Sequence, residues 1–160
     1  MIKITVIALG RLKEKYLRDA SDEYSKRLSR YCKLNSVELE PVRLPDNPSQ
    51  KQSDSALEQE GQKILGSISD NTHIISMCIE GENLSSEQFA EYINKVSVQS
   101  SSNIAIIIGS SFGLCDKIKQ MSAKKLSFSK MTFPHQLARI MLLEQVYRAF
   151  KINEGSDYHK

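Results

Sequence analysis

The stretch that decides the fold runs from Ile104 to Gly113 and reads Ile-Ala-Ile-Ile-Ile-Gly-Ser-Ser-Phe-Gly. Its first five residues are apolar with no polar residue between them, which predicts a strand covered on both faces, as in a parallel sheet. A turn bounded by Gly109 and Gly113 follows at once. Because open parallel sheets bind ligands beside the turns that leave their strands, we expect the functional chemistry in this last third of the chain.

Strand and helix signals alternate on either side of this stretch. Strands are expected at residues 2–9, from 37 to 39, at 73–79, at 104–108 and at 125–128. Helices are expected at 13–31, from the capping-box pattern Ser55–Glu58, from the similar pattern Ser85–Gln88, at 116–122, and from Pro134 onward. This order predicts an α/β fold with a mostly parallel sheet flanked by helices. No repeat or linker divides the chain, so we expect one domain over residues 1–160.

The composition predicts a soluble protein of a reducing compartment. The chain has 160 residues, of which 40% are hydrophobic, and this is enough for a core without disulfide bonds. Cys32, Cys78 and Cys115 form no C-x-x-C pair, so we expect free thiols. The apolar start of the chain runs directly into the charged residues 11–15, without a cleavage site or a membrane span. We therefore expect a cytoplasmic protein that binds no membrane.

The charges are divided unevenly along the chain. Residues 1–33 carry 9 Lys and Arg against 4 Asp and Glu, and residues 117–160 carry 9 against 3. The middle, residues 34–116, carries 4 against 12. Two basic ends predict a polyanionic partner such as a nucleic acid, because phosphate binding depends on clustered Lys and Arg and not on net charge. An ordinary solvated surface is the alternative.

The last helix is apolar around most of its circumference. The apolar residues that surround it include Leu137, Ile140, Met141, Leu142, Leu143, Val146, Tyr147, Ala149 and Phe150. One sheet face covers only part of such a helix. We therefore expect a homodimer, with a core helix enclosed in a monomer as the alternative.

The turn at 109–113 permits two interpretations. It matches G-x-S-x-G, so a serine hydrolase would use Ser111 with Asp157 and His159, although only one strand signal remains after Ser111 to carry the other two. Alternatively, Gly109 and Gly113 let the backbone turn sharply beside a nucleotide-like cofactor. The nicotinamide pattern G-x-G-x-x-G is absent, and the histidines and cysteines lack the spacing of metal ligands, so no metal is expected.

Two further groups of polar residues are candidates for function. His135 and Arg139 lie four residues apart, on one face of an otherwise apolar helix. Before them, Ser129, Lys130 and Thr132 alternate with apolar residues. This segment is either an ordinary strand end or a loop that binds a heterocyclic ring through backbone groups and apolar side chains.

Four segments together resemble the small SPOUT methyltransferases of the ribosomal RNA large subunit methyltransferase H family. They are Ile4–Tyr16, Leu126–Arg139, Glu144–Ile152 and the terminal Tyr158-His159-Lys160. The likeness covers essentially the full length and combines a loop, a helix and a tail in one order. It implies a homodimer with a C-terminal trefoil knot, an arrangement that general rules of chain topology disfavour. It also implies an S-adenosylmethionine-dependent enzyme that methylates N3 of a pseudouridine in 23S rRNA of the assembled ribosome.

The resemblance also implies which residues of this chain form the site. The cofactor would contact Met77, Gly109 and the loop made of Phe128, Ser129, Lys130, Met131, Thr132 and Phe133. Family members usually have a second glycine after the first, whereas this chain has Ser110, so serine would carry a backbone conformation that favours glycine.

Methyl transfer requires alignment, removal of an imide proton and stabilisation of the resulting anion, and it needs no metal. For this reaction, we expect His135 and Arg139 to stabilise the anion, His159 to act as the base and Tyr158 to stack on the nucleobase. Phosphates of the rRNA would meet basic residues at the start of the chain, namely Arg11, Lys15, Arg18, Lys26, Arg27 and Arg30. A small serine hydrolase and a non-catalytic RNA-binding adaptor are the competing hypotheses.

Overall fold

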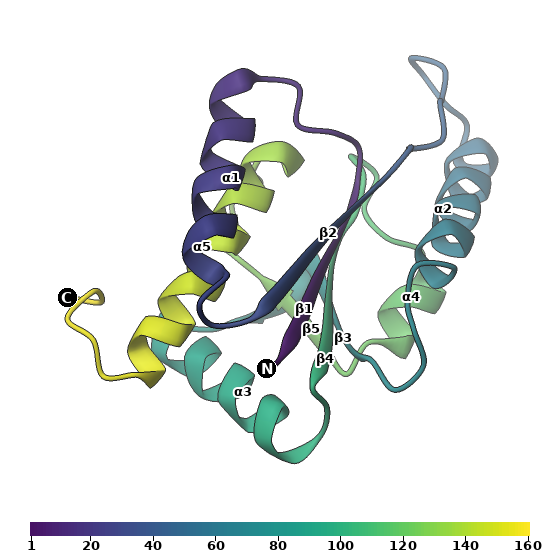
Figure 1. Cartoon of the computed structure of the whole chain (residues 1–160). Helices are drawn as coiled ribbons and strands as arrows, with labels where there is room; N and C mark the ends of the chain where they lie inside the picture. The colour runs from purple at the N-terminus through teal and green to yellow at the C-terminus, as the bar shows by residue number, and fades with distance from the viewer.

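The isoleucine-rich run forms the middle strand of a five-stranded parallel sheet in the computed structural model, which describes residues 1–160 (Figure 1). The strands are β1 (Lys3–Leu9), β2 (Lys33–Leu39), β3 (His73–Asn83), β4 (Asn103–Ile108) and β5 (Lys124–Ser127). The helices are α1 (Lys15–Leu28), α2 (Gln50–Leu65), α3 (Ser86–Gln99), α4 (Asp116–Met121) and α5 (His135–Asn153). The sheet order is β2-β1-β4-β3-β5, and every neighbouring pair is parallel. The expected α/β fold is confirmed, with a sheet that is parallel throughout.

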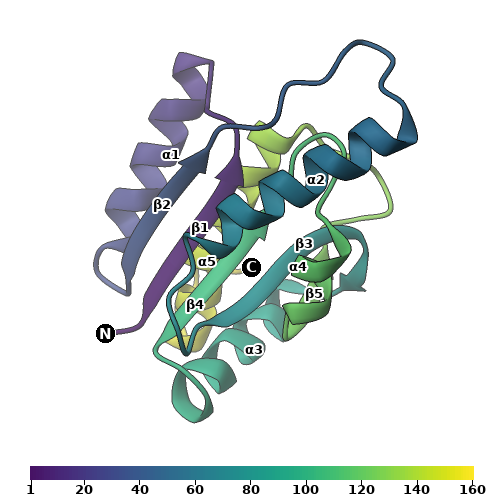
Figure 2. The same ribbon diagram turned by 90° about the vertical axis from the view of Figure 1, so that its right-hand side faces the viewer.

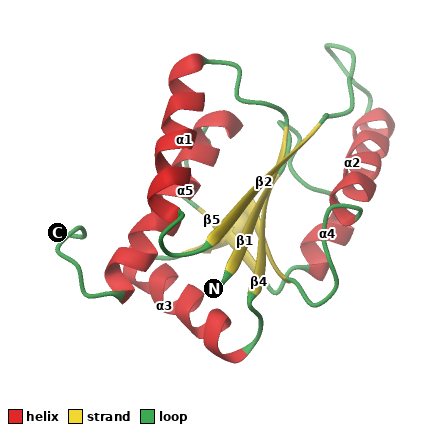
Figure 3. Ribbon diagram, in the orientation of Figure 1, coloured by secondary structure: helices red, strands yellow, loops and turns green.

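Strand β4 is buried on both faces, as its composition predicts. Ile104, Ile106 and Ile108 belong to the larger hydrophobic core, beneath α1, α3 and α5. Ala105 and Ile107 point to the other face and pack in the smaller core with residues of α2 and α4. Figures 2 and 3 show these two groups of helices on opposite sides of the sheet. The parallel arrangement brings the carboxyl ends of all five strands to one edge.

Helix α5 obtains most of its apolar cover inside one chain. Its buried residues, which include Leu142, Leu143 and Val146, pack in the larger core, and the helix also contacts α1 and α3. Leu137 remains 41% exposed. Packing within one chain thus buries much of the apolar surface of α5, and the homodimer stays a prediction. None of the helices combines the length and the apolar character needed to cross a membrane.

Several boundaries differ from the sequence-based expectation. Helix α2 begins at Gln50 and not at Ser55, because Ser49 and Gln52 form the capping box and Ser55 lies inside the helix. Strand β2 begins at Lys33, four residues early, because pairing with β1 extends an edge strand whose residues are mostly polar. Helix α1 starts two residues later than expected and buries Leu17, so that Tyr16 is 69% exposed. Pro134 caps α5 and is not its first residue.

The capping box of α2 gives a matched test of this correction. Ser49→Ala removes the side chain that accepts a hydrogen bond from the Gln52 amide, so we expect a loss of about 1 kcal/mol in the free energy of unfolding. Ser55→Ala, at an exposed position within the helix, should be neutral or slightly stabilising because alanine is the better helix former. Urea denaturation measures both variants, and a larger loss for Ser55→Ala would contradict the observed helix start.

Candidate functional site

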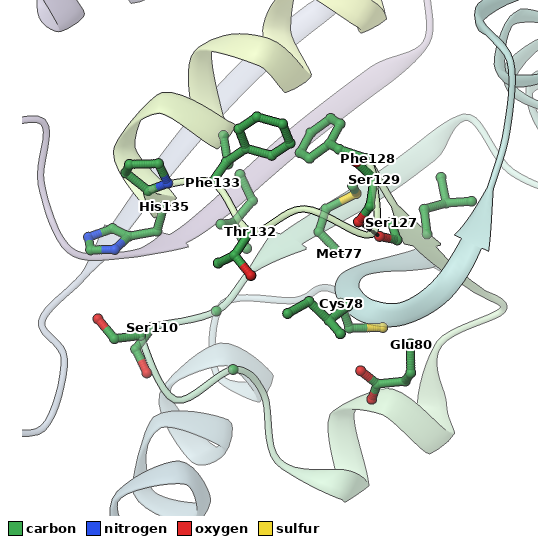
Figure 4. A pocket seen from close by; sticks show the side chains of 18 of the residues that line it. Met77, Cys78, Glu80, Ser110, Ser127, Phe128, Ser129, Thr132, Phe133 and His135 are labelled. Carbon is green, nitrogen blue, oxygen red and sulfur yellow. Dashed lines mark hydrogen bonds between the residues drawn. The ribbon is translucent and has the colours of Figure 1, made fainter.

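A cleft of about 680 Å³ lies where the carboxyl ends of β3, β4 and β5 meet the start of α5 (Figure 4). Its volume falls within the range of small-molecule sites, which is roughly 300–1,000 Å³. One wall is apolar and includes Met77, Leu126, Phe128 and Phe133. Glu80 is the only acidic residue that lines the cleft. Lys119 also lines the cleft and pairs with Glu80 over 2.5 Å, so a ligand with an aromatic ring and a polar part fits this combination.

Two glycines allow backbone segments to approach one another around the cleft. A Cβ atom at Gly109 would collide with the carbonyl oxygen of Gly113, and a Cβ atom at Gly81 would collide with the backbone of Leu126. Gly81 lies in the part of β3 that departs from its pairing with β5, between Met77 and Glu82. The irregularity places residues 78–80 on the cleft. Both glycines are therefore required by packing of the backbone, independently of any ligand.

Ser110 occupies its turn without strain. Asn71 is the only residue other than glycine with a positive φ, so Ser110 does not adopt the conformation that favours glycine. The amide of Gly113, which has φ +87°, donates to the Ser110 carbonyl over 2.9 Å and closes the turn. The expectation that Ser110 carries a conformation that favours glycine is thus wrong, because the left-handed conformation belongs to Gly113.

The loop from Phe128 to Phe133 forms a second side of the cleft. The Ser129 hydroxyl accepts a hydrogen bond from the Met131 amide over 3.1 Å, and the Ser127 hydroxyl donates to the Ser129 carbonyl over 2.9 Å. These bonds hold the loop in a turn. Seven of the eight residues expected at the cofactor line the cleft, and they are Met77, Gly109, Phe128, Ser129, Met131, Thr132 and Phe133. Lys130 is exposed and does not line it.

His135 and Arg139 do not form one shared ridge. His135 lines the cleft, and burial, followed by the positive charges of Arg139 and Lys13, lowers the pKa of its imidazole. Arg139 is buried and does not line the cleft. Its Nη1 pairs with Glu38 over 2.7 Å, and its Nη2 donates to the Gly10 carbonyl over 3.3 Å. The two residues therefore act from different places, with His135 uncharged at neutral pH.

The C-terminal tail lies along α5, away from the cleft. The Tyr158 hydroxyl donates to Glu144 over 3.2 Å, and the Tyr158 ring meets the Tyr147 ring edge-on at 5.1 Å. His159 contacts Arg148 through Nδ1 at 3.1 Å and Glu87 through Nε2 at 2.7 Å. Glu144 lies nine residues after His135, which corresponds to roughly 14 Å of helix rise. Tyr158 and His159 are thus not brought together with His135 in one chain.

Glu144 and Arg148 were not among the residues expected from the sequence to have a role. They form an ion pair of 2.6 Å, and both are more than three-quarters buried. Their spacing of four residues on an apolar helix was the available signal, since such pairs are neighbours on a helix surface. Together they hold the tail through Tyr158 and His159.

All six basic residues expected at the start of the chain are exposed, and they are Arg11, Lys15, Arg18, Lys26, Arg27 and Arg30. Lys15 and Arg27 are neutralised in part by Asp19 and Glu23, at 2.6 and 2.9 Å. The segment before α1 contacts the start of α5 beside His135, because the amide of Lys13 donates to the Gln136 side chain over 2.9 Å. The basic surface and the His135 end of the cleft are therefore adjacent.

The arrangement of the histidines gives little support to the serine hydrolase alternative. His159, the histidine proposed for a hydrolase, contacts Arg148 and Glu87, and no histidine hydrogen-bonds to Ser111. No group of three or more His, Cys, Asp or Glu side chains is placed to hold a metal ion. The three cysteines are free, and burial raises the pKa of the Cys32 thiol to about 11.

Comparison with known proteins identifies the family. The family described as "Predicted SPOUT methyltransferase" matches residues 2–159. The chain belongs to the SPOUT methyltransferases. Ribosomal RNA large subunit methyltransferase H of Clostridium botulinum (strain Alaska E43 / Type E3) is 53% identical over 159 residues, which cover 99% of this chain and 100% of that protein. The proteins of the same name from Clostridium perfringens (strain 13 / Type A) and Clostridium acetobutylicum are 54% and 52% identical over the same shares.

The family resemblance is thus confirmed, and the chain is a methyltransferase enzyme. Its fold agrees with this assignment, since a parallel α/β sheet carries a ligand cleft at the carboxyl ends of its strands. The roles of individual residues remain predictions.

The lowered pKa of His135 predicts a direct titration result. We expect its imidazole resonance, assigned by loss in His135→Gln, to titrate below pH 6.5 in an NMR experiment. Because the unfolded chain binds this proton more readily, stability should fall as the pH drops below about 6.5, and His135→Gln should lose this part of the acid sensitivity. A titration midpoint above 6.5 would show that the site does not lower the pKa of His135.

Proposed function

We propose that this methyltransferase transfers a methyl group from S-adenosylmethionine to N3 of a pseudouridine in the 23S rRNA of the assembled ribosome. The observation that carries the proposal is the convergence of the Gly109 turn, the irregular end of β3 and the Phe128–Phe133 loop on one cleft, in a chain of this family. The names of the relatives, which specify ribosomal RNA of the large subunit, support the substrate class.

The residues of the cleft suit S-adenosylmethionine. Met77, Leu126 and the two phenylalanines of the loop provide an apolar surface for the adenine ring. Gly109 lets the backbone of Gly113 pack against it, and this contact gives the turn its shape beside the cleft. Glu80 supplies a carboxylate for hydroxyl groups or for positive charge, and Lys119 pairs with it over 2.5 Å. No metal takes part in this proposal.

The protein has two tasks in the reaction, because the bound cofactor itself supplies an electrophilic methyl group on a sulfonium. The N3–H proton must be removed, and the ring nitrogen must then be aligned so that the N–C bond forms as the C–S bond breaks. His159 is the base expected from the resemblance, and His135 is a second candidate, because its lowered pKa leaves a neutral imidazole at the cleft. Arg139, which is held by Glu38, acts as a fixed positive charge behind His135.

Tyr158 and His159 complete the site in this proposal if they come from a second copy. Glu144, which binds Tyr158, lies roughly 14 Å along α5 from His135 in the same chain, so one chain does not bring the tail to its own cleft. Tyr16 and Leu137 are 69% and 41% exposed, and the Lys13–Gln136 hydrogen bond joins the segments that carry them. This exposed apolar surface at the start of α1 and α5 supports a homodimer.

Other parts of the proposal follow from the family. Residues 1–160 form a single SPOUT domain with a trefoil knot in the C-terminal half, and the enzyme acts in the cytoplasm on ribosomes. The exposed basic residues around α1 bind rRNA phosphates and set the register, while the tail handles the base. Lys26 and Arg30 are the strongest candidates for phosphate contacts, because the other four are engaged within the chain. Arg11, Lys15 and Arg27 form ion pairs, and Arg18 donates to the carbonyls of Leu12 and Lys13.

The proposed cofactor is tested by calorimetry. Titration with S-adenosylmethionine should show saturable binding at about one site per chain, and Gly109→Val should abolish it, because the side chain would fill the space against Gly113. Circular dichroism verifies that the variant is folded. Absence of heat with the wild type, together with labelling of Ser111 by a fluorophosphonate, would falsify the proposal in favour of a hydrolase.

The tail is tested by deletion and by complementation. Removal of residues 158–160 should lower methylation of unmodified ribosomes by about 100-fold or more, with cofactor binding retained, because the tail supplies catalytic groups and little core. A mixture of the deletion variant with Gly109→Val should regain activity, since a mixed dimer contains one intact cleft and one intact tail. Mass spectrometry of the rRNA measures the product. A deletion variant with wild-type activity would remove Tyr158 and His159 from the active site.

A further inference from the structure

A buried carboxylate connects the cleft turn to the rest of the protein. Glu60, on α2, is only 4% exposed, and no cation pairs with it. Its Oε1 accepts a hydrogen bond from the Ser110 hydroxyl over 2.9 Å. Its Oε2 accepts from the Val42 amide over 3.0 Å. One side chain therefore joins the connection between β2 and α2 to the turn that follows β4.

The position of Glu60 in the core does not by itself explain an acidic residue. Burial of a carboxylate without a cation is unfavourable unless hydrogen bonds compensate, and an apolar side chain of similar size is often equally stable. The neighbouring buried residue of α2 on the same side, Ile64, is apolar and packs in the smaller core. Glu60 differs from it because each of its oxygens meets a donor.

Ser110 is the only residue of the turn 109–113 whose side chain makes a hydrogen bond. The two glycines give the turn its shape, but they also leave it with few packing contacts. Ser111 and Phe112 are exposed, and Phe112 is 51% exposed. The contact with Glu60 is therefore the anchor that restricts how Ser110 and the adjacent backbone of Gly109 lie against the cleft.

We propose that Glu60 is a positioning residue that fixes the cleft turn for cofactor binding through the Ser110 hydroxyl. This inference rests on the proposed cofactor site, because the turn is treated as one of its walls. The carboxylate does not reach the ligand. It acts by reducing the motion of the turn before the ligand binds, so that less freedom is lost on binding. The expected effect is on cofactor affinity and not on the rate of methyl transfer at saturation.

A matched pair of substitutions isolates the hydroxyl. Ser110→Thr keeps it, whereas Ser110→Val has nearly the same shape without it. We expect Ser110→Val to raise the Kd for S-adenosylmethionine about tenfold and Ser110→Thr to remain close to the wild type, because a hydrogen bond to a charged acceptor is lost only in the first. The methylation rate at saturating cofactor should be similar in both variants.

A double-mutant cycle assigns the effect to Glu60. In the background of Glu60→Leu, threonine and valine at position 110 should no longer differ, because the acceptor is absent. Glu58→Leu, on the exposed side of the same helix, is the control in which the difference should persist. If Glu60→Leu does not fold, the pair at position 110 still decides the question.

Hydrogen exchange of the ligand-free protein separates this inference from the proposed function. The Gly113 amide, which donates to the Ser110 carbonyl, should exchange faster in Ser110→Val than in Ser110→Thr. If the two variants differ in exchange but the wild-type protein binds no S-adenosylmethionine, the proposed function is overturned. The hydrogen bond between Ser110 and Glu60 would then still hold the turn. Equal exchange and equal affinity in the two variants would overturn the role of Glu60.

Discussion

The structure depends on the burial of β4 from both sides. Because Ile106 and Ile107 face opposite cores and both are fully buried, this strand has to lie inside the sheet, with helices above and below. Helices on both faces require crossover connections, and these make the strands parallel. A parallel sheet collects all its carboxyl ends at one edge. The cleft, its turns and the start of α5 are consequences of that single constraint.

The cleft is shaped by close approach of backbone segments more than by side chains. Gly109 lies against Gly113, and Gly81 lies against Leu126, at distances that exclude a Cβ atom. The irregular part of β3 and the connections after β4 and β5 can therefore converge on one small volume. This arrangement leaves backbone groups and apolar side chains as the main ligand contacts. It suits a cofactor that is a planar ring joined to a flexible polar chain.

The sequence allows the fold class and most of the cleft to be predicted because both depend on local patterns. The isoleucine run and the glycine turn indicate β4 and the edge of the sheet that carries the cleft, and the family resemblance indicates Phe128–Phe133. The start of α2 could not be predicted, because Ser49–Gln52 and Ser55–Glu58 match the same capping-box pattern. The structure shows that the first of them caps the helix. Contacts between segments that are distant along the chain could not be predicted from the sequence either. Neither the Glu38–Arg139 pair nor the Glu60–Ser110 bond, which joins residues 50 positions apart, leaves a periodic signal.

The surroundings of His135 show how contacts between distant segments affect the pKa of a side chain in the cleft. Arg139 lies one helical turn after His135, and its guanidinium is fixed by Glu38 and by the Gly10 carbonyl. Burial is the main cause of the lowered pKa of the His135 imidazole, and the positive charges of Arg139 and Lys13 act in the same direction. In the proposed reaction, a cationic imidazole would also oppose the sulfonium of the cofactor, and a neutral His135 avoids that repulsion. We infer that burial, together with the fixed charge of Arg139, keeps the imidazole uncharged before the reaction begins.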